Sequence, residues 1–301
     1  MSKLRLKENQ ENSDDSKYLF TFSRGWNHDD RIGIHILDVE SRVEQKYSIK
    51  FPRQTLFMPS IVRLPNNELA CFGCFVSATY TNGVLYRDNI ESFICIINSL
   101  TMKITRKLTF PGRHRAGCTT VFIKGYVYII CLPHNDTIYT LLKYDLSRNS
   151  LKKLARLKLG SYSLNLLSFE DNILIGSNDR NAYIYDLYSN SYSEIPLIAF
   201  YGHKVFISSK GRAYYLEFEG FIYESGFKNP YIWNKVKDFS PKYKINNIID
   251  VTWVYYNGLI FLRNCIKTMK GYEPEEFYLE FNLDCKDIQR IDISKKKCNL
   301  F

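Results

Sequence analysis

Long apolar runs are missing from this chain of 301 residues. No segment approaches the roughly 18 uninterrupted apolar residues that a membrane-spanning helix needs. The N-terminal stretch MSKLRLKENQENSDDSK also lacks the apolar core of a secretory signal peptide. We therefore expect no membrane span and a cytoplasmic location. Residues 1–16 hold too few apolar side chains to offset the entropy lost on ordering, which predicts a disordered tail, with an edge strand over Ser2–Lys7 as the alternative.

Clustered positive charge is also lacking, although the chain as a whole is basic. The formal net charge is +10 and the pI is near 9.0, yet the longest run of basic residues is Lys295–Lys297. A basic balance favours nucleic acid, anionic membrane or acidic protein partners, whereas scattered lysines are typical of a general compositional bias. The charge alone does not choose between these interpretations.

Sequence motifs of catalysis and metal binding are absent. There is no Gly-x-Ser-x-Gly, no His-Glu-x-x-His and no phosphate-binding glycine loop. The Cys71-x-x-Cys74 pair has no second pair of ligands at zinc spacing, and residues three apart on a strand point to opposite faces. His28 lies beside Asp29 and Asp30, and His114 lies between two arginines, which makes these two histidines candidates for a polar site. We expect no catalytic residue, no cofactor and no metal.

Cysteine usage is consistent with a reducing compartment. The chain has eight cysteines, and most lie inside runs typical of strands, where a reduced thiol behaves as a small apolar side chain. We predict free thiols at these positions: Cys71, Cys74, Cys95, Cys118 and Cys131.

Aromatic residues are abundant, with 23 Tyr and 20 Phe, and this composition favours strands over helices. Four short strands follow one another between Arg115 and Leu154: Cys118–Ile123, Tyr126–Cys131, Thr137–Tyr144 and Ser150–Leu154. This stretch is typical of one blade of a β-propeller.

The pattern recurs along the chain, most clearly at the turn before the fourth strand. There an aromatic or aliphatic residue precedes Asp, Asn or Glu, whose side chains can bond to the backbone two residues on. Six such turns occur: Leu37-Asp38, Ile97-Asn98, Tyr144-Asp145, Tyr185-Asp186, Tyr223-Glu224 and Phe281-Asn282. Their mean spacing is about 49 residues, the period of kelch blades.

We predict an all-β, six-bladed propeller of four-stranded antiparallel blades, with one domain over residues 17–301. The expected blades are 17–50, 58–109, 115–156, 162–197, 203–238 and 249–293. Five units contain all four strands. In the first, Tyr18–Arg24 fits the second strand and Ile32–Asp38 the third, so the innermost strand is expected from a chain terminus, either Ser2–Lys7 or Cys298–Phe301.

On these residues the chain resembles the kelch-repeat family from about Lys17 to Ile293. The Tyr-Asp turn followed by an apolar outer strand carries the resemblance. The diglycine of that family is missing: the equivalent places read Phe72-Gly73-Cys74, Ile130-Cys131-Leu132 and Ile175-Gly176-Ser177. The resemblance is therefore to a diverged member. It implies a scaffold, such as a substrate receptor of a ubiquitin ligase or a cytoskeletal adaptor.

Propeller topology sorts the loops by face and suggests where a partner binds. The connections between blades and those between second and third strands lie on one face, and in sequence the former carry mostly basic residues: Arg53, Arg113, His114, Arg115, Arg156, Lys158, Lys242 and Lys244. Two second-to-third connections are long, Ser77–Ile90 and Asn264–Glu275, and we interpret both as loops. These loops contain Tyr80, Tyr86, Arg87, Met269 and Tyr272, residue types common in protein interfaces. Loops that simply tolerate insertion are the alternative interpretation.

Three functional hypotheses follow. The first is a non-catalytic protein-interaction module that binds a protein, such as one with an acidic peptide, through ten candidate residues: Arg53, Tyr80, Tyr86, Arg87, Arg113, His114, Arg115, Lys158, Lys242 and Tyr272. The second is an RNA- or ribosome-associated propeller, in which binding would weaken steeply with salt. The third is an enzyme with a site at the central channel.

Overall fold

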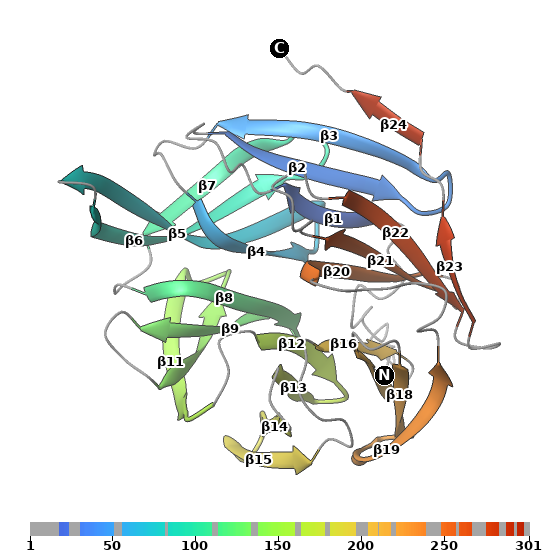
Figure 1. The fold of residues 1–301 in the computed structure, drawn as a ribbon. Helices are drawn as coiled ribbons and strands as arrows, with labels where there is room; N and C mark the ends of the chain where they lie inside the picture. The colour runs from blue at the N-terminus through green and yellow to red at the C-terminus, as the bar shows by residue number, and fades with distance from the viewer. Residues whose placement is uncertain are drawn as a thin grey trace, which may run out of the picture.

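A computed structural model describes the fold over most of the chain. The described residues are 18–23, 31–50, 56–81, 84–109, 114–133, 138–159, 164–177, 181–196, 204–209, 211–217, 221–238, 248–256, 259–266, 275–282, 287–291 and 294–297. Within these ranges, 24 strands form six four-stranded sheets that are arranged around a ring (Figure 1). The same residues contain no helix of the length and apolar character that a membrane crossing needs.

Five sheets are antiparallel throughout, and each consists of four consecutive strands. The second sheet holds β4 (Leu56–Leu64), β5 (Glu68–Thr81), β6 (Val84–Asn98) and β7 (Lys103–Thr109). The third holds β8 (His114–Ile123), β9 (Tyr126–Pro133), β10 (Tyr139–Asp145) and β11 (Ser150–Leu157). The fourth holds β12 (Leu164–Phe169), β13 (Asn172–Ser177), β14 (Asn181–Asp186) and β15 (Ser191–Pro196).

The fifth sheet holds β16 (Lys204–Ser209), β17 (Arg212–Glu217), β18 (Phe221–Gly226) and β19 (Asn229–Asp238). The sixth holds β20 (Ile248–Tyr256), β21 (Leu259–Ile266), β22 (Glu275–Asn282) and β23 (Asp287–Ile291). These five sheets confirm the five complete four-stranded units, and with them the all-β propeller arrangement, that the sequence predicted.

The first sheet differs from the prediction. It combines three antiparallel strands, β1 (Tyr18–Ser23), β2 (Arg31–Asp38) and β3 (Val43–Lys50), with β24 (Ser294–Lys297), which pairs in parallel with β3. The strand β24, which the sequence did not predict, lies at the edge of this sheet that is opposite to β1. Among the described strands of this sheet, β1 lies nearest the centre of the ring, because it contacts β4 and β20, the first strands of the two neighbouring sheets. Ser2–Lys7 and Cys298–Phe301 lie outside the described residues.

The core lies between consecutive sheets. Apolar side chains on the face of one sheet pack against those of the next, as Phe72 and Ile94 do against Val127 and Leu142. Similar clusters join the first sheet to the second, the third to the fourth and the fourth to the fifth. A further cluster joins the first sheet to the sixth and includes Leu19, Leu37, Val39, Tyr278 and Ile291. The described residues therefore bury apolar surface at five junctions between neighbouring sheets, and this burial stabilises the propeller.

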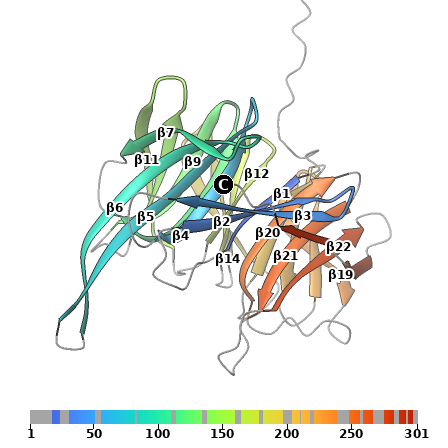
Figure 2. The ribbon, with the colours of Figure 1, turned by 90° about the horizontal axis from the view of Figure 1, so that it is seen from above.

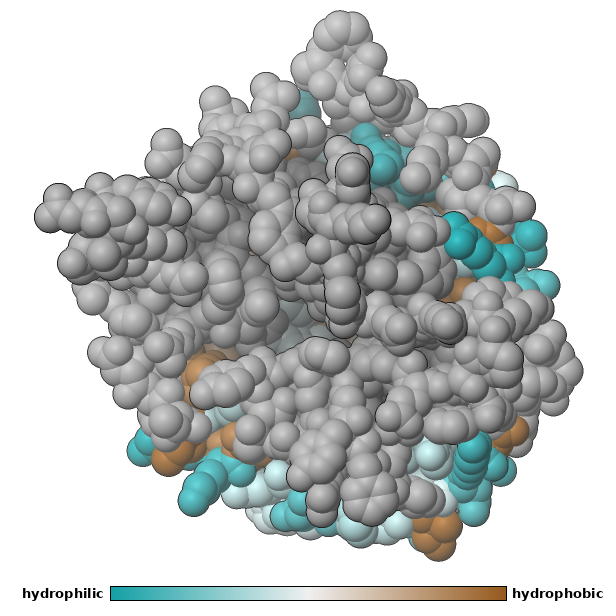
Figure 3. Space-filling view, in the orientation of Figure 1, coloured by the Kyte–Doolittle hydropathy of each residue, from teal (hydrophilic) through white to brown (hydrophobic). Residues whose placement is uncertain are grey.

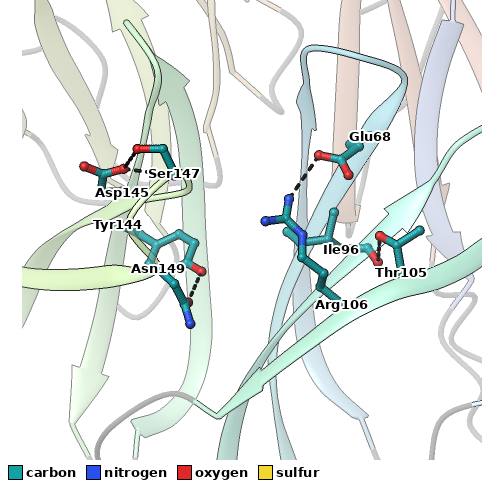
Figure 4. A network of polar contacts seen from close by, with 8 residues as sticks. All are labelled: Glu68, Ile96, Thr105, Arg106, Tyr144, Asp145, Ser147 and Asn149. Carbon is teal, nitrogen blue, oxygen red and sulfur yellow. Dashed lines mark hydrogen bonds and ion pairs between the residues drawn. The ribbon is translucent and has the colours of Figure 1, made fainter.

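Four of the six predicted turns have the expected geometry. The side-chain Oδ1 of Asp145 accepts a hydrogen bond from the backbone N–H of Ser147 at 2.9 Å (Figure 4). It accepts a second from the backbone N–H of Arg148 at 3.1 Å. The Oδ1 of Asp186 accepts the same pair of bonds from Tyr188 and Ser189, at 2.7 and 2.8 Å. Asp38 and Asn98 do likewise in the first two sheets.

The same turns share a second feature, four residues further on. Arg42, Met102, Asn149 and Asn190 all have φ between 49° and 56°, the left-handed region. In two of these turns the residue before the Asp is a tyrosine whose hydroxyl donates to that Asn: Tyr144 to Asn149 at 2.6 Å and Tyr185 to Asn190 at 3.3 Å. Asp145 and Asp186 thus occupy equivalent surroundings, as expected of repeated units.

The fifth predicted turn is wrong. Glu224 lies inside β18 and is buried, where it accepts a hydrogen bond from the Tyr214 hydroxyl at 3.0 Å. The chain reverses later, between Gly226 and Asn229. A Glu side chain is longer than Asp or Asn and favours a distant partner over its own turn. Asn282, the sixth, ends β22, and the four residues after it lie outside the described part.

Three cysteines confirm the prediction of buried free thiols. Cys71, Cys95 and Cys131 are free and fully buried. Cys71 on β5 is the register partner of Cys95 on β6. Burial raises the pKa of both thiols, that of Cys95 to about 11. The side chains of Cys74 and Cys118 are outside the described part of the structure.

Candidate functional site

The antiparallel order of the strands defines two faces of the ring. The connections between sheets and between second and third strands lie on one side, which we call the link face, and the remaining turns lie on the other, which we call the turn face. Ion pairs between neighbouring sheets support this division. Lys124, in the first turn of the third sheet, lies 2.6 Å from the Asp171 carboxylate in the first turn of the fourth. Lys228, in the fifth sheet, lies 3.9 Å from Glu170 of that same turn.

The two longest of the described strands form a ribbon on the link face. β5 and β6 stay paired from Glu68 opposite Asn98 to Thr81 opposite Val84. Their neighbours end earlier: β4 pairs with β5 only as far as Phe75, and β7 pairs with β6 only from Phe93. Beyond these points the ribbon has two strands, and it projects from the rest of the ring (Figure 2).

The ribbon corrects the sequence interpretation of Ser77–Ile90 as a long loop. Its residues alternate between apolar and polar over Val76–Thr81, and Asn82-Gly83 connects the strands, which together are a strong hairpin signal. The register shifts once, between Ser77 and Ala78, so that Asp88 on β6 has no partner on β5. That irregularity is a β-bulge.

The ribbon brings together three of the ten predicted binding residues. Tyr80 on β5 is the register partner of Leu85, while Tyr86 and Arg87 on β6 are partners of Thr79 and Ala78. His114 and Arg115 begin β8, opposite Pro133 and Leu132, and so enter the third sheet from the link face. Lys158 follows β11 on the same face, where it is exposed between buried Leu157 and Leu159. Arg53, Arg113, Lys242 and Tyr272 lie outside the described residues, as does His28.

A buried polar cluster, which we call the clasp, joins the first sheet to the sixth. The Glu44 carboxylate on β3 is 0% exposed, and its Oε1 lies 2.9 Å from Nδ1 of His35 on β2. The Tyr278 hydroxyl on β22 donates a hydrogen bond to the same oxygen. Lys46 Nζ lies 3.9 Å from the other oxygen, Oε2, which accepts no hydrogen bond from the described residues.

The electrostatics of the clasp favour an ionised carboxylate. Burial alone would raise the pKa of Glu44, but the hydrogen bonds from His35 and Tyr278 and the charges of His35 and Lys46 outweigh it and hold the pKa at about 2. A second ion pair lies at the same junction: Arg42 Nη2 is 3.2 Å from Glu280 Oε2, and Gln289 donates to Glu280 at 2.9 Å. These contacts link the first sheet to the sixth, so we assign the clasp a structural role.

No sequence feature singled out the clasp. Glu44 occupies one position of a polar strand, and its partner Tyr278 lies 234 residues away. An acidic residue between Val43 and Gln45 reads as surface, because only the tertiary fold shows what covers it.

Exposed apolar side chains gather on two neighbouring sheets. Among the described residues, seven large apolar side chains are exposed, and five of them belong to the fourth and fifth sheets: Tyr188, Tyr192, Phe227, Tyr231 and Ile232. We call these five the rim patch. Three residues of β19, Pro230–Ile232, have no partner on β18, and this bulge displays Tyr231 and Ile232. The Tyr231 hydroxyl lies 2.7 Å from Ser193 Oγ on β15, which links the two sheets. In the space-filling view of Figure 3, the lower edge, where Figure 1 places β15 and β19, mixes brown areas with white and teal ones.

Metal-binding groups are not assembled in the described part of the chain. No group of three or more His, Cys, Asp or Glu residues is placed there to hold an ion. This finding does not extend to His28, Asp29 and Asp30.

Comparison with known proteins gives the fold alone. No protein-family model and no curated protein matches the chain. A solved structure described as "Structure of YjhT" is similar over 93% of this chain and 99% of its own length, with a TM-score of 0.59 and 10% sequence identity. At this identity the likeness shows a shared propeller architecture.

Proposed function

We propose that the protein is a non-catalytic interaction module, a diverged kelch-type propeller of six blades that binds a partner protein through its link face. The ribbon carries the proposal. Strands β5 and β6 continue beyond the ends of their pairing with β4 and β7. In this stretch they pair with each other and with no other described strand. Extended elements that project from a rigid scaffold are where recognition usually occurs.

The charge of the chain favours an acidic partner. A net charge of +10 attracts acidic proteins over long range and speeds their association. His114, Arg115 and Lys158 enter or leave their sheets on the side from which the ribbon projects. A ubiquitin-ligase component or a cytoskeletal protein fits this description, as does any protein with an acidic segment, and we place the complex in the cytoplasm.

Shortening the ribbon tests the proposal. The variant removes residues 77–80 from β5 and 85–89 from β6, including the bulge at Asp88, so that the Thr81–Val84 pair follows Val76–Ile90 in the same alternation and every strand of the ring is kept. Affinity purification should recover a stoichiometric partner with the wild-type chain and lose it with this variant. Charge reversal of Arg115 to Glu should weaken the same complex and make it less sensitive to salt.

The matched control is Tyr188→Ser. Tyr188 is 98% exposed and lies on the turn face, in the rim patch. Its replacement should leave the complex intact. If the shortened ribbon still recovers the same partner, or if Tyr188→Ser alone loses it, the partner binds another surface and the proposal is overturned.

A further inference from the structure

The two edges of the ribbon are not equivalent. On β5, residues Val76–Thr81 pair with β6 on one side, and no strand in the described ranges pairs with the other side. Six residues at about 3.4 Å each give an open edge of about 20 Å. On β6, the edge carries the bulge at Asp88 beside Arg87. Bulges and charges on an edge strand are devices that prevent further pairing.

The β5 edge has none of these protections. Its sequence, VSATYT, contains no charge, no proline and no glycine, and it alternates strictly between apolar and small polar residues. Natural sheets avoid such edges because their unpaired N–H and C=O groups form a template for another strand. An unprotected edge beside a protected one indicates that β5 is the side on which a strand is added.

The protein already adds a strand to one sheet in this way. Residues Ser294–Lys297 pair in parallel with β3 at the outer edge of the first sheet. A segment of four residues, which pairs with no described strand other than β3, is therefore enough to extend a sheet of this protein.

We infer that the β5 edge, Val76–Thr81, binds an extended segment of the partner protein by β-strand addition. This inference rests on the proposed function and names the partner chemistry. The central part of this segment, about six residues, is uncharged because the β5 edge that it faces is uncharged. Its flanks carry acidic residues because the net charge of the chain is +10. A second copy of this chain fits less well, because two such charges repel each other.

The backbone geometry identifies the donors that the segment would use. Thr81 and Val84 are partners across a two-residue connection, so they form a hydrogen-bonded pair. Pairs alternate along an antiparallel ladder, which makes Thr79–Tyr86 hydrogen-bonded and leaves the N–H groups of Ala78 and Tyr80 facing outward. Tyr80→Pro removes one outward donor without removing a bond between β5 and β6, and Tyr80→Ala removes the same ring while it keeps the donor.

The test uses a phage-displayed library of random dodecapeptides, selected on the wild-type protein and counter-selected on the shortened ribbon. The selected peptides should have alternating apolar and polar residues in the middle and acidic residues at both ends. Each synthetic peptide should bind Tyr80→Pro about tenfold more weakly than Tyr80→Ala, the effect of one or two lost hydrogen bonds. Equal binding to the two variants, or a selection that yields no such peptides, would overturn strand addition.

A second measurement leaves the protein unchanged, in case Tyr80→Pro disturbs the ribbon. Methylation of the peptide's own backbone nitrogens should weaken binding about tenfold at every second residue and have little effect at the residues between, because only alternate N–H groups face β5. An effect without this alternation contradicts strand addition.

The remaining outcomes are also distinct. Wild-type protein that forms a dimer in solution, and loses it with Tyr80→Pro, would show that a second copy occupies the edge, and our assignment of the occupant would be wrong. If the shortened ribbon loses the partner while peptide methylation shows no alternation, the proposed function stands and strand addition fails. If the shortened ribbon keeps the partner, the proposed function itself fails.

Discussion

Tyr278 on the sixth sheet donates a hydrogen bond to the fully buried carboxylate of Glu44 on the first sheet. The same oxygen lies 2.9 Å from Nδ1 of His35, which is also on the first sheet. One carboxylate therefore contacts side chains of both the first and the sixth sheet. The apolar cluster of Leu19, Leu37 and Tyr278 lies at the same junction. Ring closure in this protein is therefore both apolar and ionic.

Replacing Glu44 by Gln should destabilise the fold by about 3 kcal/mol, because it removes the charge that His35 and Lys46 face and weakens two buried hydrogen bonds. Urea unfolding of the two proteins measures the difference. Glu194→Gln is the control, since Glu194 is exposed on β15 and its replacement should change the unfolding free energy by less than about 0.5 kcal/mol. A Glu44→Gln variant as stable as this control would show that the clasp does not close the ring.

Stability should depend on pH through Glu44 in a defined window. Its folded-state pKa of about 2 lies below the ordinary 4.5, so the ionised form is favoured by folding. The contribution is fully present above pH 4.5 and is lost as the pH falls through about 2. Each unit of difference between the folded and the ordinary pKa corresponds to about 1.4 kcal/mol, so the total loss amounts to about 3 kcal/mol. Unfolding midpoints measured from pH 5 to pH 2 should fall more steeply for the wild type than for Glu44→Gln, and parallel curves would contradict this.

The thiols of Cys71, Cys95 and Cys131 should resist alkylation in the folded protein. All three are buried, and burial raises the pKa of the first two, so little thiolate forms at pH 8 and reagent cannot reach it. Mass spectrometry after brief iodoacetamide treatment should find these residues unmodified in buffer and modified in urea. Rapid labelling of Cys71 or Cys95 in buffer would mean that the interface between the first and second sheets opens readily.

The repeated turns should contribute separately to stability. Asp145→Ala and Asp186→Ala each remove an acceptor of two backbone N–H groups, and each should lower the free energy of unfolding. The two turns lie in different sheets and share no partner, so the double variant should show the sum of the two losses. Asp171→Ala, which removes only an exposed ion pair with Lys124, should cost less than about 0.5 kcal/mol in the same unfolding assay.

Local features of the fold could be predicted from the sequence, because they depend on neighbouring residues. The Asp and Asn turns at Asp38, Asn98, Asp145 and Asp186 are set by side chains that bond two and three residues on. In the second, third and fourth sheets these turns and the strand patterns between them predict the complete unit, whereas in the fifth sheet the strand pattern alone does so.

Features that join distant segments could not be predicted in this way. The parallel pairing of β24 with β3 depends on which edge of the first sheet stays open, and four residues rich in lysine carry no signal for it. Glu44 reads as a surface residue until β22 is placed against it. The ribbon was within reach of sequence reasoning through Asn82-Gly83, but its length led to the interpretation of a loop.

The most direct test of a binding ribbon is the affinity of the purified partner for two forms of this protein. Measured by isothermal titration at one salt concentration, the partner should bind the shortened ribbon at least about tenfold more weakly than the wild type, which corresponds to about 1.4 kcal/mol. Tyr188→Ser should bind like the wild type. Equal affinity for the wild type and the shortened ribbon would contradict the account.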